Sequence, residues 1–261
     1  AFYDLRSESG TIHISGPRSG CTNSIIPAGG LLNIPYFYEG CTCSYPLPVG
    51  LALVSMPQEH EQWASWGEGR PADIIRLGIN LGAPGDRVDS NGTLWLDEPS
   101  VGGPSPSVSI SVSPLKARYH YRHSLWIKGG RGWPWVCASG VSGLSTITVK
   151  GLRRGEFTLR LYFAELEGKG AGERVFNVSA GGEQLLGSLD IVAEAGGPLR
   201  GIVKEFPGLA IDGKLDIELE ASRGRALLCG LELISKHLEP GPTYNIERKK
   251  AGHRLVLPAE R

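Results

Sequence analysis

One stretch of the chain concentrates the aromatic and polar side chains that sugar recognition needs. Residues 118–135 read RYHYRHSLWIKGGRGWPW, so aromatic residues are interleaved there with arginine and histidine. Flat aromatic faces pack against the C–H side of a sugar ring, and a few fixed polar groups read its hydroxyls. The candidate carbohydrate-binding residues of this stretch are therefore Tyr119, Tyr121, His123, Trp126, Trp133 and Trp135, with His120 and Arg122 among them.

The same aromatic residues also have a purely structural interpretation. Large aromatic side chains are usually packed inside proteins. Trp133 and Trp135 flank Pro134 and would then fill a core, whereas Tyr119 and Tyr121 would alternate on a strand with one buried face. The sequence alone leaves both interpretations open.

A second group of candidates places carboxylates beside an indole between residues 86 and 98. Its candidate sugar contacts are Trp95 and Asp97, and the group also holds Asp86, Asp89, Asn91 and Glu98. Turn chemistry explains most of it, because residues 89–92 read DSNG, and Asp and Asn favour turns without any ligand. Such oxygen groups can hold calcium, but no EF-hand-like spacing is present, so we predict no metal site.

The front of the chain carries three cysteines, Cys21, Cys41 and Cys43. A zinc site usually has four ligands in CxxC-type pairs, and C-x-C with one distant cysteine and a nearby His13 matches that poorly. A disulfide from Cys21 to Cys41 or Cys43 closes a loop of about 20 residues and contributes roughly 3 kcal/mol in the chain-entropy model. A disulfide predicts an exported protein, in the periplasm, at the cell surface or outside the cell.

Two further cysteines, Cys137 and Cys229, lie in the strand-rich part of the chain. Cys229 falls within the apolar run ALLCGLELI and is expected to be a small buried core residue rather than a reactive thiol. With five cysteines in the chain, at least one has no partner within it. The absence of C-x-x-C-H argues against covalent haem.

Catalytic motifs are absent from the sequence. It has no G-x-S-x-G, no H-E-x-x-H, no P-loop and no G-x-G-x-x-G after a strand. Glycoside hydrolysis needs two opposed carboxyl groups at a defined separation, and sequence neighbours such as Glu165 with Glu167, or Asp97 with Glu98, rarely supply that. We predict a protein with no intrinsic catalysis and no cofactor.

Charge and hydropathy exclude several classes of partner. Lys plus Arg and Asp plus Glu each number 27, so no net charge draws the chain to nucleic acid or to an acidic membrane. No apolar run approaches the ~20 residues that cross a bilayer, so membrane insertion is not expected. The first residues, AFYDLRSESG, do not resemble a signal peptide, and we expect a mature or excised piece.

The elements that position these residues are predicted to be strands. The 37 glycines and 18 prolines break helices but suit short strands joined by tight turns. Apolar residues alternate in EFTLRLYFAE and in KLDIEL, which is typical of strands with one buried face. Strands are expected at 74–79, 107–112, 145–149, 156–165, 174–179, 202–205, 214–219 and 226–234, and one helix is considered at 57–66. This spacing predicts an all-β fold, a jelly-roll or galactose-binding-like β-sandwich with a small cysteine-containing N-terminal extension.

Composition divides the chain into four segments. Residues 1–56 are rich in Gly and Pro and form the cysteine-bearing extension, residues 57–73 are a polar linker, residues 74–235 form the sandwich, and residues 236–261 form a tail with a basic cluster. The extension is too short to be stable as an independent domain unless disulfides stabilise it, because small chains bury proportionally little surface.

The strand FTLRLYFAE and the following RVFNV are carried by residues 157–165 and 174–178. Together with Gly181–Gly182 and the runs LDIVAEAGG and ALLCGLELI, they resemble the malectin family, with Asn177 where aspartate is usual. The resemblance covers residues 74–235 and implies a β-sandwich of carbohydrate-binding type.

The resemblance also has departures. In animal malectin, an aromatic pair that contacts the sugar comes just after the F-A-E strand, where this chain has Leu166 and Glu167. An acidic contact expected shortly before Cys229 is replaced by the basic sequence SRGR, residues 222–225. The fold and the general class of ligand are therefore implied, but the diglucose specificity of malectin is not.

Residues 1–56 are similar to the end of PQQ-type β-propeller proteins of exported bacterial systems, through a C…IPA-GLL…C-C-Y run. The sequence as a whole leads to two hypotheses. The chain is a non-catalytic carbohydrate-binding module of an exported bacterial protein, whose partner is an oligo- or polysaccharide. Alternatively, it is a structural or protein-docking module attached to a β-propeller, without sugar binding.

Overall fold

The structure is a computed structural model of the 261-residue chain. It describes residues 2–3, 11–12, 25–29, 31–35, 50–54, 63, 75–101, 108–241 and 243–246. The chain divides into two compact units, Ala1–Pro57 and Gln58–Arg261. Among the described residues, no helix has the length and apolar character needed to span a bilayer.

The described residues of the N-terminal unit form short antiparallel strands. β1 (Phe2–Tyr3) pairs with β2 (Thr11–Ile12). β3 (Ile26–Ala28), β4 (Leu31–Ile34) and β5 (Leu51–Val54) form a three-stranded sheet in that order. Cys21, Cys41 and Cys43 lie outside the described residues, so their pairing stays a prediction.

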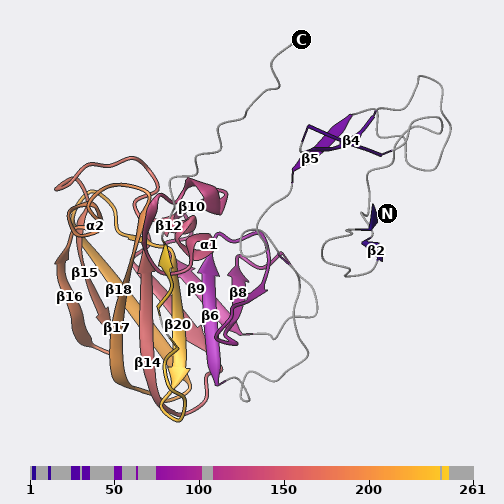
Figure 1. The fold of residues 1–261 in the computed structure, drawn as a ribbon. Coiled ribbons are helices and arrows are strands. Elements are labelled where there is room, and N and C mark those ends of the chain that lie inside the picture. The colour runs from indigo at the N-terminus through magenta and orange to yellow at the C-terminus, as the bar shows by residue number, and fades with distance from the viewer. Residues whose placement is uncertain are drawn as a thin grey trace. The chain divides into compact units, whose positions relative to one another are not determined.

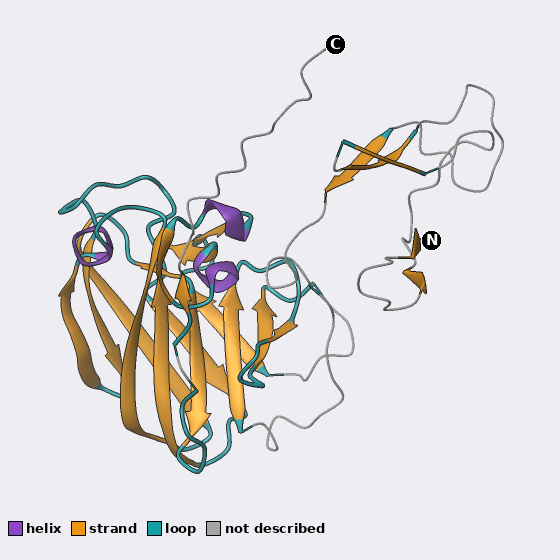
Figure 2. Ribbon diagram, viewed as in Figure 1, coloured by secondary structure: helices purple, strands orange, loops and turns teal. Residues whose placement is uncertain are grey.

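The second unit contains two large sheets that face each other (Figures 1 and 2). The first has eight strands in the order β21-β11-β17-β14-β20-β6-β8-β7. In that order they span Asn245–Ile246, Gly129–Arg131, Arg200–Ile211, Gly155–Phe163, Gly230–Ser235, Arg76–Leu81, Leu94–Glu98 and Arg87–Val88. The second has five strands, β16-β15-β18-β13-β9, which span Glu183–Leu189, Val175–Ala180, Lys214–Arg223, Thr146–Lys150 and Ser109–Ser113.

A small third sheet and three short helical segments complete the described part of the unit. The sheet has the order β10-β12-β19 and consists of Arg118–Tyr121, Ser139–Ser142 and Leu227–Leu228. The helical segments are η2 (Ser124–Trp126), α1 (Pro134–Cys137) and α2 (Ile191–Ala195). Figure 1 shows β10, β12 and α1 at the end of the sandwich where β14 and β6 finish.

The core lies between the two large sheets and follows from the alternation of apolar residues. Leu159, Leu161 and Phe163 of β14 are fully buried on the face that the sequence pattern predicts. Ile147 of β13 and Phe176 of β15 are equally buried in the opposite sheet. Burial of large aliphatic and aromatic side chains contributes about 1.5–3 kcal/mol each, which makes this layer the main source of stability.

A second, aromatic core covers the outer face of the eight-stranded sheet. The Trp95 indole lies over Gly78, where a Cβ atom would come within 2.2 Å of the ring. The ring centroid of Trp95 is 5.1 Å from that of Tyr162 and 5.5 Å from that of Trp135, both in edge-to-face geometry. Glycine at position 78 therefore makes the space that buries the indole.

A buried ionic network accompanies this aromatic core. The Glu232 carboxylate is fully buried and accepts hydrogen bonds from Thr93 Oγ1 at 2.7 Å and Tyr162 Oη at 2.9 Å. Arg160 Nη1 lies 3.5 Å from the same carboxylate, and its Nε donates to Glu205 at 2.6 Å. The network satisfies polar groups that would otherwise be buried without partners.

The all-β sandwich predicted from the sequence is confirmed. Each predicted strand overlaps an observed strand, although 226–234 divides at Cys229 into β19 and β20, which belong to different sheets. Of the helix considered at 57–66, only Trp63 is described, and that residue is not helical. α1 and α2 were not predicted, because each has only four or five residues and no helical periodicity to reveal it.

Candidate functional site

The edge strand β10 exposes two of the predicted aromatic residues. Because side chains alternate along a strand, Tyr119 and Tyr121 share one face, and Arg118 and His120 share the other. Among the described strands, β10 pairs only with β12, at one edge of the three-stranded sheet. Tyr119 is 37% exposed and Tyr121 47% exposed, so both present ring surface to solvent.

The segment after β10 adds a third exposed ring. His123 caps η2, since its Nδ1 accepts a hydrogen bond from the Leu125 amide at 3.1 Å. Trp126 follows with 55% of its surface exposed. The Arg122 guanidinium lies 5.1 Å from the centre of the Trp126 ring and donates to the Leu166 carbonyl at 3.0 Å. These contacts hold a cation against one side of an exposed indole.

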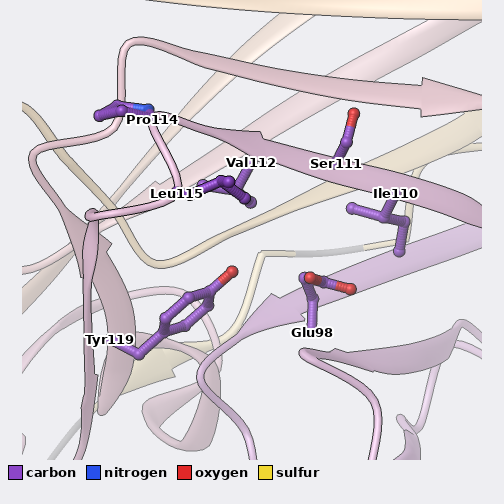
Figure 3. Close-up of a pocket in the computed structure, with 7 residues that line it drawn as sticks. All are labelled: Glu98, Ile110, Ser111, Val112, Pro114, Leu115 and Tyr119. Atoms are coloured by element: carbon purple, nitrogen blue, oxygen red, sulfur yellow. The ribbon is translucent and has the colours of Figure 1, made fainter.

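Tyr119 also lines a cavity of about 290 Å³ beside the end of β8 (Figure 3). The walls come from three elements: β8, β9 with the turn that follows it, and β10. The lining residues are Glu98, Ile110, Ser111, Val112, Pro114, Leu115 and Tyr119. In Figure 3 the Glu98 carboxylate and the Tyr119 hydroxyl lie on the same side of the aliphatic wall. The cavity thus offers an apolar surface with two polar groups at its rim.

The two polar groups of the cavity, Glu98 and Tyr119, shift each other's pKa. Burial, then the charge of Asp97, raises the pKa of Glu98, while the hydrogen bond with Tyr119 opposes that rise. Burial, the Glu98 charge and the same hydrogen bond raise the pKa of Tyr119 to about 12. The Tyr119 hydroxyl is therefore protonated and donates its hydrogen bond to the Glu98 carboxylate.

Three tryptophans predicted as sugar contacts belong to the core instead. Trp133 is 9% exposed, Trp135 2% and Trp95 0%. Trp133 stacks on Tyr244 with the ring centroids 4.9 Å apart. Trp135 packs against Trp95 after Pro134 has started α1. The structural interpretation of Trp133 and Trp135 is correct. Tyr119 and Tyr121 do alternate on a strand, β10, but the face that they share is exposed rather than buried.

Asp97 and its acidic neighbours have structural partners as well. Asp97 is 4% exposed, and one of its carboxylate oxygens accepts from the Val101 amide at 2.8 Å. Asp86 accepts from the Asp97 amide at 2.9 Å. Asp89 accepts from the Asn91 and Thr93 amides and, at 2.9 Å, from the indole Nε1 of Trp95. These carboxylates shape turns and the core, as their turn-like sequence indicated, and Asp97 is not a surface contact.

The other face of β10 borders a charged pocket that the sequence did not single out. His120 Nε2 lies 2.9 Å from Ser142 Oγ and 3.5 Å from the Glu167 carboxylate. Arg174, which is almost fully buried, donates to Glu165 at 2.6 Å and to Glu167 at 2.5 Å. Glu165 has a structural role here, since its carboxylate also accepts a hydrogen bond from the Glu167 amide at 2.7 Å.

The charged pocket has a volume of about 380 Å³. It is lined by Glu167, Lys169, Glu173, Arg174, Gly224 and Arg225. Burial alone would raise the pKa of Glu167, but hydrogen bonding to Arg174 and the Arg174 and His120 charges lower it below the usual value. Three of the lining residues, Glu167, Gly224 and Arg225, fall in the two segments where the sequence departs from animal malectin.

Within the described part of the chain, no three His, Cys, Asp or Glu residues are grouped closely enough to hold a metal ion. Cys137 and Cys229 are free and fully buried, and burial raises the pKa of both thiols. Cys229 is therefore a core residue, as its apolar surroundings predicted.

Comparison with known proteins gives one family and a set of similar folds. None of the curated proteins matches this sequence. Among solved structures, Bacteroides uniformis β-glucuronidase is 17% identical with a TM-score of 0.48, covering 62% of this chain and 18% of that one. The ANXUR2 extracellular domain from Arabidopsis thaliana is 17% identical with a TM-score of 0.47, covering 70% of this chain and 56% of that one. This chain thus spans less than two thirds of either protein.

The family match lies within the second unit. Residues 136–235 match the model described as Malectin domain, so the matched part runs from α1 through β20 and includes the charged pocket. β10 and η2 precede it. The malectin resemblance of residues 74–135 stays a prediction from the sequence. The propeller resemblance of residues 1–56 stays a prediction as well. Over residues 136–235, this chain is therefore similar to the malectin domain.

Proposed function

We propose that the second unit is a non-catalytic, lectin-like module that binds an oligo- or polysaccharide. The malectin match supports the class, because this is a carbohydrate-binding type of fold. The observation that carries the proposal is the exposure of three aromatic rings, Tyr119, Tyr121 and Trp126, on consecutive elements at one end of the sandwich.

The chemistry of these elements suits a sugar. Tyr121 and Trp126 offer flat apolar surface, and Trp126 is kept in place by Arg122 on one side. Tyr119 and Glu98, which hydrogen-bond to each other, add polar oxygens that can accept hydrogen bonds from sugar hydroxyls beside an aliphatic cavity. A saccharide presents both C–H faces and hydroxyls, so this pairing of flat rings with few polar groups matches it.

A glycan-array screen of the full chain tests the proposal, with Tyr121→Ala and Trp126→Ala variants run beside it. Binding by the wild type that is lost in both variants supports a site on β10 and η2. Val88→Ala is the matched control, because Val88 is 43% exposed on β7 and lies outside the site. Saccharide binding that survives both aromatic substitutions contradicts the assignment of the site.

A second candidate function is protein docking. Leu115 is fully exposed and Leu125 is 47% exposed, so aliphatic side chains adjoin the aromatic ones. Exposed apolar surface of this kind also marks protein interfaces. An array on which no glycan binds would favour docking, with the propeller to which residues 1–56 are similar as the first partner to test.

We infer an exported bacterial protein, whose front segment derives from the end of a β-propeller and contains a disulfide between Cys21 and Cys41 or Cys43. The spacing of those cysteines and the run that residues 1–56 share with propeller proteins support this. Mass spectrometry of the non-reduced, protease-digested chain would identify the cross-linked peptides, and three free thiols at these positions would contradict it.

A further inference from the structure

The charged pocket has two cations, Lys169 and Arg225, in its lining besides Arg174. Its base is the Arg174 guanidinium, which bridges Glu165 and Glu167 and also donates to the Arg225 carbonyl. Gly224 packs so closely on the segment before β15 that a Cβ there would meet the Glu173 carbonyl at 2.5 Å. Glycine at position 224 therefore allows this close approach of the two backbone segments.

Lys169 and Arg225 differ from the other charged residues of the pocket. Glu167 is paired with Arg174, and Glu173 accepts a hydrogen bond from the Gly170 amide. Within the described residues, neither the Lys169 ammonium nor the Arg225 guanidinium has a hydrogen-bond or ion-pair partner, although both line the cavity. Their backbones are held, since the Lys169 amide lies 3.5 Å from a Glu165 carboxylate oxygen and the Arg225 carbonyl accepts from Arg174.

The charges around the pocket do not cancel. Arg118 lies 4.0 Å from Glu167 on the β10 side, and the Arg223 guanidinium lies near Gly172. The cavity itself is lined by the cations Lys169, Arg174 and Arg225 and by the carboxylates Glu167 and Glu173. Outside the lining, Asp190 accepts a hydrogen bond from the Gly172 amide at 2.6 Å. A partly enclosed site with excess positive charge attracts an anion, and arginine matches a planar carboxylate or a sulfate with two parallel hydrogen bonds.

We propose that this pocket binds the anionic group of an acidic saccharide, a carboxylate or a sulfate, through Arg225 and Lys169. The inference rests on the proposed carbohydrate-binding function and names its ligand class. The exposed aromatic rings and the charged pocket lie on opposite faces of β10. One acidic oligosaccharide would bind both surfaces, with its neutral sugar rings on Tyr121 and Trp126 and its charged group at Arg225.

The test is a nuclear magnetic resonance titration of the isotope-labelled full chain with glucuronate, with sodium sulfate and with glucose. Saturable shifts of the Gly168, Gly170 and Gly224 amides are expected with an anion and not with glucose. Shifts with glucuronate alone identify a carboxylate site, and shifts with sulfate identify a site for sulfated sugars. Arg225→Gln and Lys169→Gln should each weaken the affinity by about tenfold, the size expected for one charged hydrogen bond.

Arg153→Gln is the matched control, because Arg153 is an exposed cation in the turn before β14, at the opposite end of that strand. It should leave the titration unchanged. Absence of shifts at the pocket with either anion, or equal shifts with glucose that persist in Arg225→Gln, would overturn the inference. Array binding of neutral glycans that depends on Trp126 but not on Arg225 would likewise overturn it, while the proposed function would stand.

Discussion

At the residue scale, the buried carboxylates mark where this fold is most sensitive to substitution. Glu232 is fully buried, accepts hydrogen bonds from Thr93 and Tyr162, and forms an ion pair with Arg160. Burial, then the Glu232 charge, raises the pKa of Tyr162 well above its ordinary value, so its hydroxyl remains a donor. Removing one partner of a buried charged network leaves the others unpaired, which costs more than the network itself contributes.

We therefore expect Glu232→Ala to lower the free energy of unfolding by roughly 3–5 kcal/mol, because Arg160 and Tyr162 lose a buried acceptor. Urea denaturation followed by circular dichroism measures this. Glu220→Ala is the control, since Glu220 is an exposed residue of β18, and it should change stability by less than about 0.5 kcal/mol. Equal effects of the two substitutions would contradict this interpretation of the network.

His120 gives the fold a dependence on pH. It faces Ser142, Glu167 and the guanidinium groups of Arg118, Arg122 and Arg174. Burial is the main cause that lowers the pKa of His120 below its ordinary value, with the three arginines adding to it and Glu167 opposing it. A histidine with a lowered folded-state pKa is more readily protonated when unfolded, so its protonation favours unfolding below about pH 6.5.

Stability should accordingly fall as the pH drops from about 7.5 to about 5.5, across the ordinary histidine pKa, and His120→Gln should reduce that fall. Urea denaturation of both proteins at the two pH values provides the comparison. Gln retains a donor for Ser142 or Glu167, so the variant is expected to fold. An unchanged pH dependence in the variant would show that His120 does not titrate as its surroundings indicate.

At the element scale, the outer face of the eight-stranded sheet depends on glycine at a defined register. Gly78 of β6 pairs with Trp95 of the parallel strand β8, and the indole crosses the glycine toward β20. Gly230 of β20 keeps the neighbouring position clear, since its Cβ would meet the Ile79 carbonyl at 2.6 Å. These two positions allow a tryptophan to be buried on the outer face of this sheet.

Gly78→Ala should lower the free energy of unfolding by about 1–3 kcal/mol, because the added methyl group overlaps the Trp95 ring and forces the ring to move. Thermal and urea denaturation would both detect the change. Gly155→Ala at the start of β14 is the control, since its Cβ meets only Phe157 at an ordinary 3.5 Å. A Gly78→Ala protein as stable as the Gly155→Ala protein would contradict this packing.

The strands could be predicted from the sequence, but the site could be predicted only in part. Alternating apolar residues reveal β14 and β18 because one face of each is buried against the opposite sheet. The segment that forms β12 reads SGVS and carries no such alternation, so the three-stranded sheet that presents Tyr119 and Tyr121 is not evident from the sequence. The burial of Trp95 depends on Gly78 and Gly230, which are far apart in the sequence.

The charged pocket shows the same limit. Glu167 and Arg225 come from distant parts of the chain and meet only because Arg174 binds both the Glu167 carboxylate and the Arg225 carbonyl. No spacing rule connects such residues. The local pattern in 118–135 indicates the exposed rings, but it also indicates Trp133 and Trp135, because a sequence does not tell which face of a strand or helix is covered.

At the scale of the whole molecule, stability and recognition occupy different places. The core between the two sheets and the aromatic core on the outer face are closed, whereas Tyr121 at the end of β10 and Trp126 in η2 have exposed rings. Substituting the exposed rings should therefore leave the free energy of unfolding within about 0.5 kcal/mol of the wild-type value. This separation makes a binding test on these residues interpretable.

The most direct test is calorimetric titration of the strongest array ligand into the full wild-type chain and into the folded Tyr121→Ala, Trp126→Ala double variant. We predict saturable binding to the wild type and at least about a tenfold loss of affinity in the variant, because each ring contributes apolar contact area. Equal affinity for the two proteins would contradict the central claim that the exposed aromatic rings form the saccharide site.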